Sequence, residues 1–216
     1  MKQRIFFCNL ILLLFIIAIF TNCNSNNISH DKTTYESKEI GKQVWMIENL
    51  NVSKFSNGDP ILEAYTDDDW SNAGDKNKPA FCYYNNDPIN EVKYGKLYNW
   101  SAMIDNRGLC PKGWHVPLEE EWATLFDYLG GEDSAGNKMK STIGWKIYNG
   151  TNSSSFAGLP GGFRDYRTFS KIGYYGIWWI HSSTPETYNL KYDWDKVEHG
   201  FTNKQDGESV RCIKNK

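Results

Sequence analysis

The sequence lacks the short motifs that identify many enzymes and nucleotide-binding proteins. It contains no HExxH, GxSxG or CxxC motif and no GxxxxGK[ST] phosphate-binding loop. It also lacks a block of basic residues, and its formal net charge is −2, so nucleic acid is not an expected partner. We therefore expect no enzymatic activity. An uncharacterised envelope enzyme is the alternative, because a hydrolase needs only a nucleophile with a base or two positioned carboxylates.

Histidine is scarce, with four residues in the chain. His115 is the only one within a motif, and its neighbours Trp114 and Val116 favour a buried structural role. His181, followed by two serines, is no better supported as a catalytic base. The sequence therefore predicts no catalytic residue.

One stretch is rich in oxygen-bearing side chains, at residues 67–75, and it could bind calcium, which takes several oxygen ligands. The stretch lacks the EF-hand pattern, and acidic loops are common on protein surfaces. We therefore expect a surface loop there, with no metal and no cofactor.

The N-terminus has the pattern of an export signal. Lys2 and Arg4 precede an apolar run at residues 5–20, which is short for a transmembrane helix. The run ends in FTNC, which resembles a bacterial lipoprotein signal cut before the cysteine, although Asn22 replaces the usual small residue. We predict a lipoprotein signal peptide at residues 1–22 and lipidation of Cys23 with acyl chains such as palmitate. A simple secreted protein or an uncut anchor is the alternative.

Residues 23–38 are polar and show no periodicity, so we predict a flexible tether between the lipid and a folded domain at residues 39–216. Removal of the signal takes away two basic residues and leaves 22 basic against 26 acidic residues, a net charge of −4. The expected location is the cell envelope, at the outer membrane, with the lipid as membrane contact. The membrane face stays open, because no run of acidic residues follows Cys23.

The clearest predicted element is a helix at residues 119–129. Trp122, Leu125, Phe126 and Leu129 recur at helical spacing, three glutamates fill the first turn, and two glycines follow. A second helix is predicted at residues 94–104, with a further short helical turn at 135–141.

Shorter apolar and aromatic runs predict strands. Residues 39–50 predict a hairpin that turns at Gly41-Lys42, and residues 152–167 predict an irregular glycine-rich loop over the core. Further strands are expected at residues 79–86, 145–149, 173–183 and 209–213.

Three cysteines lie outside the signal and the lipid site: Cys82, Cys110 and Cys212. Export to an oxidising compartment favours a disulfide, and three single pairings are possible. We choose Cys110–Cys212, because we expect the last strand to return beside the segment that leads into the long helix. The loop closed would be worth ~4–5 kcal/mol in the entropy model. Cys82 is then a buried thiol.

Six motifs follow one another in an order that resembles a known family: GKQVWMIENLNV, YGKLYNWSA, LCPKGWHVPLEEEW, LPGGFR, GYYGIWW and GESVRCIK. They resemble the Fibrobacter succinogenes major paralogous domain over residues 39–214. That family is grouped with C-type lectin-like folds, and parts of it are similar to formylglycine-generating sulfatase-modifying enzymes. The resemblance implies an α+β domain with two helices packed on a small twisted antiparallel sheet and long irregular loops.

The chain departs from the related patterns in three places. Leu118 stands where the family usually has a Thr or Ser cap, whose absence costs about 1 kcal/mol. The EPN, QPD and WND motifs of calcium-dependent lectins are missing. Cys82 alone would be free, whereas the sulfatase-modifying enzymes use a pair of cysteines.

These observations favour a non-catalytic binding module for a glycan or a protein, because exposed Trp and Tyr stack on sugars and are enriched at interfaces. A structural or adhesive envelope component is the alternative.

Adjacent Trp178 and Trp179 should point to opposite faces of a strand, one into the core and the other outward or under the loop region. Arg164 could instead be a buried hydrogen-bond donor. The candidate ligand contacts are Trp178, Trp179, Tyr174, Tyr175, Arg164 and Tyr166.

Overall fold

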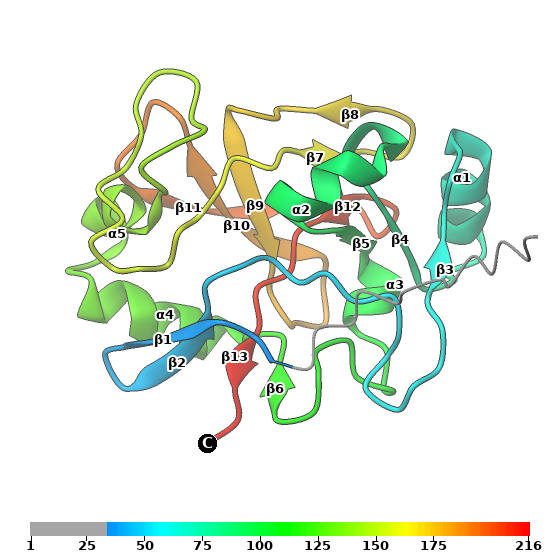
Figure 1. Cartoon of the computed structure of the whole chain (residues 1–216), viewed down its shortest axis with the longest axis horizontal. Helices are drawn as coiled ribbons and strands as arrows, with labels where there is room; N and C mark the ends of the chain where they lie inside the picture. Colours follow the sequence, from blue (N-terminus) through cyan, green and yellow to red (C-terminus); the bar gives the residue numbers. More distant parts are fainter. Residues whose placement is uncertain (1–33) are drawn as a thin grey trace, which may run out of the picture.

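The computed structural model describes residues 34–216. The predicted signal peptide, Cys23 and most of the predicted tether lie outside these residues. Over the described part, the chain forms a mixed α+β fold with five α-helices and three sheets. Figure 1 shows helix α1 at one end of the molecule and helix α5 near the other, with the strands between them.

The longest strands form a three-stranded antiparallel sheet in the order β11-β10-β9. A four-stranded sheet has the order β1-β2-β13-β6, and a six-stranded sheet of short strands has the order β3-β4-β5-β12-β7-β8. The strands are β1 (Ser37–Ile40), β2 (Gln43–Met46), β3 (Leu62–Glu63), β4 (Ala80–Cys82), β5 (Leu97–Asn99), β6 (Trp114–His115), β7 (Phe163–Arg164), β8 (Phe169–Ser170), β9 (Tyr175–Trp179), β10 (Glu186–Lys191), β11 (Val197–Phe201), β12 (Gly207–Glu208) and β13 (Ile213–Lys214).

The helices are α1 (Asp67–Asp75), α2 (Glu91–Tyr94), α3 (Trp100–Met103), α4 (Glu119–Tyr128) and α5 (Glu132–Met139), with two 3₁₀ turns at Tyr84–Asn86 and Pro88–Asn90. The predicted hairpin is confirmed as β1 and β2, and the predicted long helix as α4. The short helical turn is confirmed as α5, although it starts earlier than expected. The expected architecture had two helices, and the structure corrects this number to five.

The helix predicted at residues 94–104 is wrong. Residues 97–99 form β5, which pairs with β4 and β12, and only residues 100–103 are helical. The Asn99 side chain accepts a hydrogen bond from the Ala102 N–H at 3.0 Å and so begins α3 at that point. Pairing with distant strands outweighs the local helical spacing.

Two other local predictions are also corrected. Residues 67–75 form helix α1 and not a loop, because Thr66 and Asp69 make a reciprocal capping box at its start. Residues 145–149 form no strand. The Trp145 backbone N–H donates to the Asn149 side chain at 3.1 Å, which folds this segment back on itself.

Helix α4 is capped without the missing Thr or Ser. The Glu121 carboxylate accepts a hydrogen bond from the backbone N–H of Leu118 at 3.0 Å. The same carboxylate oxygen lies 2.8 Å from Nε2 of His115. Glu121 therefore supplies half of a capping box and ties the start of α4 to β6.

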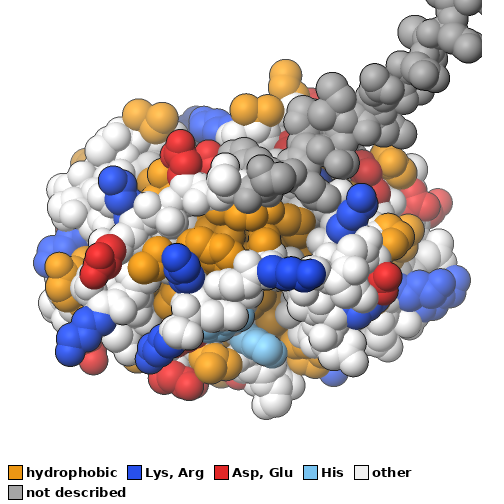
Figure 2. Space-filling model, turned by 60° about the horizontal axis from the view of Figure 1, so that its bottom comes forward, with side chains coloured by type: hydrophobic (Ala, Val, Ile, Leu, Met, Phe, Trp, Pro, Cys, Tyr) orange, Lys and Arg blue, Asp and Glu red, His pale blue; other side chains and the backbone are white. Residues whose placement is uncertain are grey.

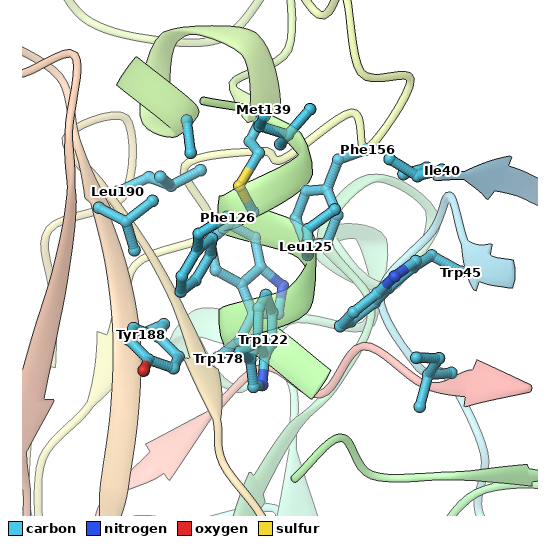
Figure 3. Close-up of a cluster of buried hydrophobic side chains, with 14 of the residues drawn as sticks. Ile40, Trp45, Trp122, Leu125, Phe126, Met139, Phe156, Trp178, Tyr188 and Leu190 are labelled. Atoms are coloured by element: carbon cyan, nitrogen blue, oxygen red, sulfur yellow. The ribbon is translucent and has the colours of Figure 1, made fainter. Parts of the chain in front are cut away.

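Aromatic rings fill the largest hydrophobic cluster, which Figure 3 shows. Trp122 of α4 lies at the centre of this cluster, with ring centroids at 4.8 Å from Trp45, 5.6 Å from Tyr188 and 5.8 Å from Phe156. These partners come from β2, β10 and the glycine-rich loop. The ring contacts therefore hold α4 against two different sheets.

Trp178 and Trp179 do point to opposite sides of β9, as predicted, but neither faces outward. Trp178 packs in the cluster around Trp122, and Trp179 packs in a second cluster with Tyr98 and Val210. Both side chains are fully buried. Each indole N–H is satisfied inside the protein, by the Asn49 side chain at 2.8 Å and by the Tyr98 carbonyl at 2.7 Å.

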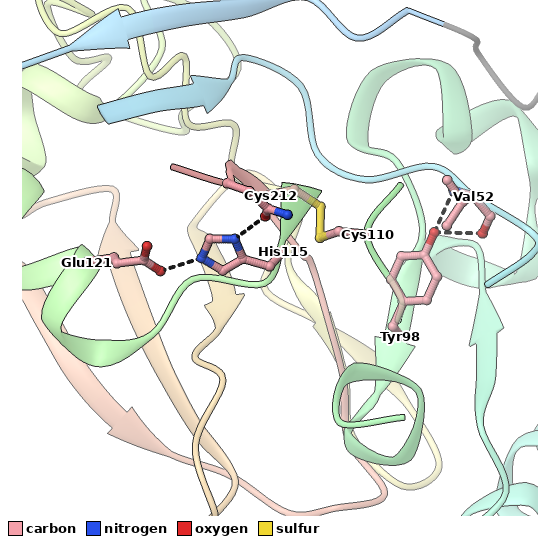
Figure 4. Close-up of a disulfide and its surroundings, with 7 residues drawn as sticks. Val52, Tyr98, Cys110, His115, Glu121 and Cys212 are labelled. Carbon is pink, nitrogen blue, oxygen red and sulfur yellow. Dashed lines mark hydrogen bonds and ion pairs between the residues drawn. A yellow bond between two sulfur atoms is a disulfide. The ribbon is translucent and has the colours of Figure 1, made fainter. Parts of the chain in front are cut away.

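The disulfide between Cys110 and Cys212 is present, as predicted, and Cys82 is a buried free thiol. It joins segments 102 residues apart. Figure 4 shows the disulfide beside the contact between His115 and Glu121. The final strand β13 lies between β2 and β6, so the first hairpin, the last strand and the segment before α4 form one sheet.

Within residues 34–216, no helix has both the length and the apolar character needed to cross a membrane.

Reduction of the disulfide should lower the free energy of unfolding by ~4–5 kcal/mol in the entropy model, because a long loop is released in the unfolded chain. Urea denaturation of residues 24–216, with and without reductant, measures this difference. A Cys82→Ala variant is the control and should keep the full effect of the reductant. An unchanged urea midpoint, with both thiols shown free by mass spectrometry, would contradict the prediction.

Candidate functional site

The surface is not uniformly polar. In the view of Figure 2, hydrophobic side chains gather in a central hollow, and lysine and arginine side chains lie on either side of it. A second concentration of aromatic side chains occurs at one end of the β9–β11 sheet. We call it the aromatic–lysine patch, and it comprises Tyr174, Tyr175, Tyr192, Trp194, Lys146, Lys171, Lys191 and Lys196.

The aromatic rings of the patch are open to solvent to different degrees. Tyr174 and Trp194 are each 37% exposed, and Tyr175 and Tyr192 are half-buried. Tyr174 and Tyr192 meet edge to face, with ring centroids 5.2 Å apart. The contact with Tyr192 therefore holds the Tyr174 ring in place while part of that ring stays open to solvent.

Lysine ammonium groups lie over these rings. The Lys191 nitrogen lies 4.3 Å from the Trp194 ring centroid and 5.4 Å from that of Tyr175. Lys196 approaches Trp194 to 4.6 Å, and Lys171 and Lys146 approach Tyr175 and Tyr174 to 5.7 and 5.9 Å. Cation–π attraction of this kind both orders the lysines and concentrates positive charge at the rings.

The sheet explains why these side chains meet. Lys191 and Tyr175 are cross-strand partners in the β9–β10 register, so their side chains share one face. The Tyr192 N–H donates to the Tyr174 carbonyl at 2.9 Å, and the Lys146 N–H donates to the Gly173 carbonyl at 2.8 Å. Backbone hydrogen bonds thus join the three segments that carry the patch.

A buried lysine supports the turn between β10 and β11 from beneath. The Lys140 ammonium, at the end of α5, donates to the Trp194 carbonyl at 2.7 Å and to the Lys191 carbonyl at 3.3 Å. Lys140 is almost completely buried, and burial lowers its pKa. This ammonium fixes the turn that presents Trp194.

Acidic groups are interspersed with the lysines. Lys191 forms a 2.6 Å ion pair with Glu198, and the neighbouring Asp193 raises the pKa of Tyr192. The Asp195 side chain accepts a hydrogen bond from Asn137 at 3.0 Å. The exposed lysines 146, 171 and 196 therefore provide most of the positive charge that faces solvent.

Of the ligand contacts predicted from the sequence, only Tyr174 and Tyr175 lie in this patch. Tyr192 and Trp194 were missed, although the alternation of aromatic and charged residues in KYDWDK at 191–196 is a usable signal. Trp178 and Trp179 are core residues, and their buried rings present no surface to a ligand.

Arg164 is fully buried, and its contacts give it a structural role. Its guanidinium donates to Asp67 at 2.6 Å and to Asn86 at 2.9 Å, and it stacks near the Trp70 ring. It therefore joins α1 to β7. Tyr166 lies on the turn after β7, where its hydroxyl lies 3.1 Å from the Asp75 carboxylate. No contact of Arg164 or Tyr166 connects them with the patch.

His115 is fixed between two acceptors. Its ring nitrogens lie 2.8 Å from the Glu121 carboxylate and 2.7 Å from the Asn215 side-chain oxygen. Both contacts are structural, because Glu121 lies at the start of α4 and Asn215 directly follows β13. Among residues 34–216, no group of three or more His, Cys, Asp or Glu side chains is placed to hold a metal ion.

Cys82 and Glu208 are buried titratable groups that lie outside the patch. Burial raises the pKa of the Cys82 thiol to about 12, which makes it a poor nucleophile. Burial, with Asp206 nearby, also raises the pKa of Glu208 well above its ordinary value. The Thr202 hydroxyl donates to the Asp206 carboxylate at 2.5 Å, and its oxygen lies 3.4 Å from a carboxyl oxygen of Glu208.

One comparison with known proteins gives a match. A family model described as the Fibrobacter succinogenes major domain matches residues 39–214. No curated protein and no solved structure matches the chain.

Glu208 gives a pH-dependent prediction. Because its folded pKa is raised, the folded state binds its proton more tightly than the unfolded state, and stability falls as pH rises through and above the ordinary carboxyl range. Glu208→Gln removes this loss and should raise the free energy of unfolding at pH 7.5. The gain should disappear near pH 4.

Urea denaturation at several pH values measures the difference, and Glu120→Gln, on the exposed first turn of α4, is the control. A Glu208→Gln variant that is less stable than the wild type by a constant amount at every pH would refute the assignment.

Proposed function

The chain belongs to the Fibrobacter succinogenes major domain family, and we propose that it is a lipid-anchored, non-catalytic binding module of the cell envelope that takes a glycan on the aromatic–lysine patch. The observation that carries this proposal is the pair of exposed rings, Tyr174 and Trp194, held at the end of the β9–β11 sheet. Tyrosine and tryptophan are suited to this role, because each has an apolar face and a polar end.

A C-type lectin-like fold is part of the proposal. Its support is the combination of α4 and α5, antiparallel sheets, a long irregular segment before β7 and a disulfide that closes most of the domain. Calcium is not required in this mode of binding, because the rings and lysines of the patch supply the contacts.

The lysines favour a glycan that carries acidic groups. An ammonium can donate up to three hydrogen bonds, and such bonds are stronger when the acceptor is a carboxylate or phosphate. Lys146, Lys171 and Lys196 are exposed around the rings and are available for that purpose. Ring stacking would hold the sugar, and the lysines would select its charge.

The proposed anchor follows from the sequence. Lipid on Cys23 would attach the chain to the outer membrane, and the polar residues that follow would separate the domain from the bilayer. No enzymatic role is proposed. Within residues 34–216, the side-chain partners of His115 are Glu121 and Asn215, and that of His199 is Glu186, so neither ring is paired with a serine or cysteine nucleophile.

A glycan array that includes uronate- and phosphate-bearing sugars tests the proposal, with residues 24–216 as the probe. We expect saturable binding that resists EDTA and weakens with salt. The Tyr174→Ala and Trp194→Ala variants should each lose more than about tenfold in affinity, as expected for aromatic hot spots.

The matched control is Tyr65→Ala, since Tyr65 is an exposed tyrosine beside the six-stranded sheet and outside the patch. Binding that is equal in all three variants would locate the ligand elsewhere. Absence of binding to every glycan would remove the carbohydrate proposal, and capture of an envelope protein lost in the same two variants would assign the patch to a protein ligand.

A further inference from the structure

A cavity of about 620 Å³ lies outside the aromatic–lysine patch, at the place where the described chain begins. Tyr35 and Glu36 form part of its wall. The other walls come from the segment after β2, from α2 and from residues 141–143 and 152–159. The part of the chain that precedes residue 34 therefore joins the domain beside this cavity.

The rim of the cavity carries aliphatic side chains that the protein leaves in water. Val92 on α2 is 92% exposed, and Ile143 on another wall is 64% exposed. Ile89, which is 74% exposed, precedes Val92 by three residues in a continuous helical segment, so these two side chains lie on one face. Exposed aliphatic side chains that gather in one place mark a surface that gains free energy when an apolar body covers it.

The charged residues of the lining give this surface no net positive charge. They are Glu36, Glu48, Glu91, Lys93 and Arg211. Glu91 pairs with Lys96 at 3.0 Å. Arg211 is buried on protein acceptors, and burial lowers its pKa while the charge of Glu48 opposes that shift. The lining therefore has no surplus cation for an anionic ligand, and its aliphatic side chains are what an occupant would cover.

The proposed lipid anchor limits which face of the domain can reach a membrane. Cys23 precedes Tyr35 by twelve residues, and a chain of that length spans at most about 40 Å. A domain of the size of residues 34–216 has a radius of gyration of about 16 Å, so the path over its surface to the opposite face is about 60 Å long. Lipid on Cys23 would therefore let the cavity face meet the bilayer and keep the opposite face away from it.

We propose that the face formed by Ile89, Val92 and Ile143 docks on the membrane that holds the anchor, with these side chains in the interfacial region of a bilayer of zwitterionic lipids. The inference rests on the lipid anchor of the proposed function and not on its glycan site, because the face shares no residue with the aromatic–lysine patch. Tyr35 and Lys93 suit such a contact, because each combines an apolar body with a polar end that stays at the level of the lipid headgroups.

Carbene labelling from within the bilayer tests this face directly. Residues 23–216 are coupled through the Cys23 thiol to maleimide-bearing phosphatidylethanolamine in phosphatidylcholine vesicles that contain a lipid with a diazirine on its acyl chain. The coupling is selective, because Cys82 is buried and Cys110 and Cys212 form the disulfide. Mass spectrometry should find the adducts concentrated in residues 88–94 and 141–143. Adducts spread evenly over the exposed surface, or concentrated in another region, would overturn the proposal.

A double variant locates the contact without disturbing the core. Ile89→Gln combined with Val92→Gln should lower the labelling of residues 141–143 at least about tenfold, because burial of each aliphatic side chain is worth that factor or more. Residues 141–143 are unchanged in this variant, so their labelling reports docking and not the loss of a labelled side chain. Phe201→Gln is the matched control, since Phe201 is 78% exposed on β11 and does not line the cavity. Unchanged labelling in the double variant, or an equal loss in the control, would contradict the assignment.

The lipid composition tests the nature of the contact. Addition of anionic phosphatidylglycerol to the vesicles should leave the labelling of residues 141–143 unchanged, because the lining has no net positive charge. An increase would show an electrostatic contact in place of an apolar one and would overturn the proposal.

The anchor itself is tested separately. Chemical coupling takes the place of the native lipid in the vesicle experiment, and mass spectrometry of the native protein shows whether Cys23 carries acyl chains. An unmodified Cys23 would remove the anchor and with it the premise of docking. Labelling that misses the face, with Cys23 acylated, would remove the docking surface and leave the anchor in place.

Discussion

The buried amide of Asn49 is the contact on which much of the fold depends. Its oxygen accepts hydrogen bonds from Trp178 at 2.8 Å and from Arg211 at 2.7 Å, and its nitrogen donates to the Tyr94 carbonyl and the Ser209 hydroxyl. The partners lie 45 to 162 residues away along the chain. A buried polar group left unpaired is costly, so this amide is fully satisfied only when all four segments are in place. The strands near this amide are short and form few ladder hydrogen bonds. The hydrogen bonds of the shared amide add connections between these segments.

The aromatic content of the chain is explained mainly by its interior. Five of the nine tryptophans, at positions 45, 70, 122, 178 and 179, are fully buried. Strand β9 has a hydrophobic cluster on each side, which is why two adjacent tryptophans are both core residues. Aromatic richness alone therefore says little about ligand binding in this chain, and the argument for a site has to rest on rings that solvent reaches.

Elements with complete local signals could be predicted from the sequence. Helix α4 has an apolar stripe, an acidic first turn and terminal glycines, and the β1–β2 hairpin has a glycine turn between short apolar runs. Residues 94–104 could not be predicted in the same way, because the pairing of β5 with β4 and β12 joins distant segments that no local window contains. The candidate site divides similarly. Tyr174 and Tyr175 stand in a recognisable motif, whereas Trp194 enters the patch through a turn that Lys140 supports from another part of the chain.

The position of β13 has a consequence for biogenesis. This strand pairs with β2 near the start of the domain, and the preceding residue forms the disulfide with Cys110. Neither the four-stranded sheet nor the covalent link can form until residues 212–214 have been synthesised. During synthesis, β2 and β6 therefore lack the strand that joins them. The sheet and the disulfide are completed in a late step, and a chain that ended before that step would leave Cys110 unpaired and the edge of β2 without β13.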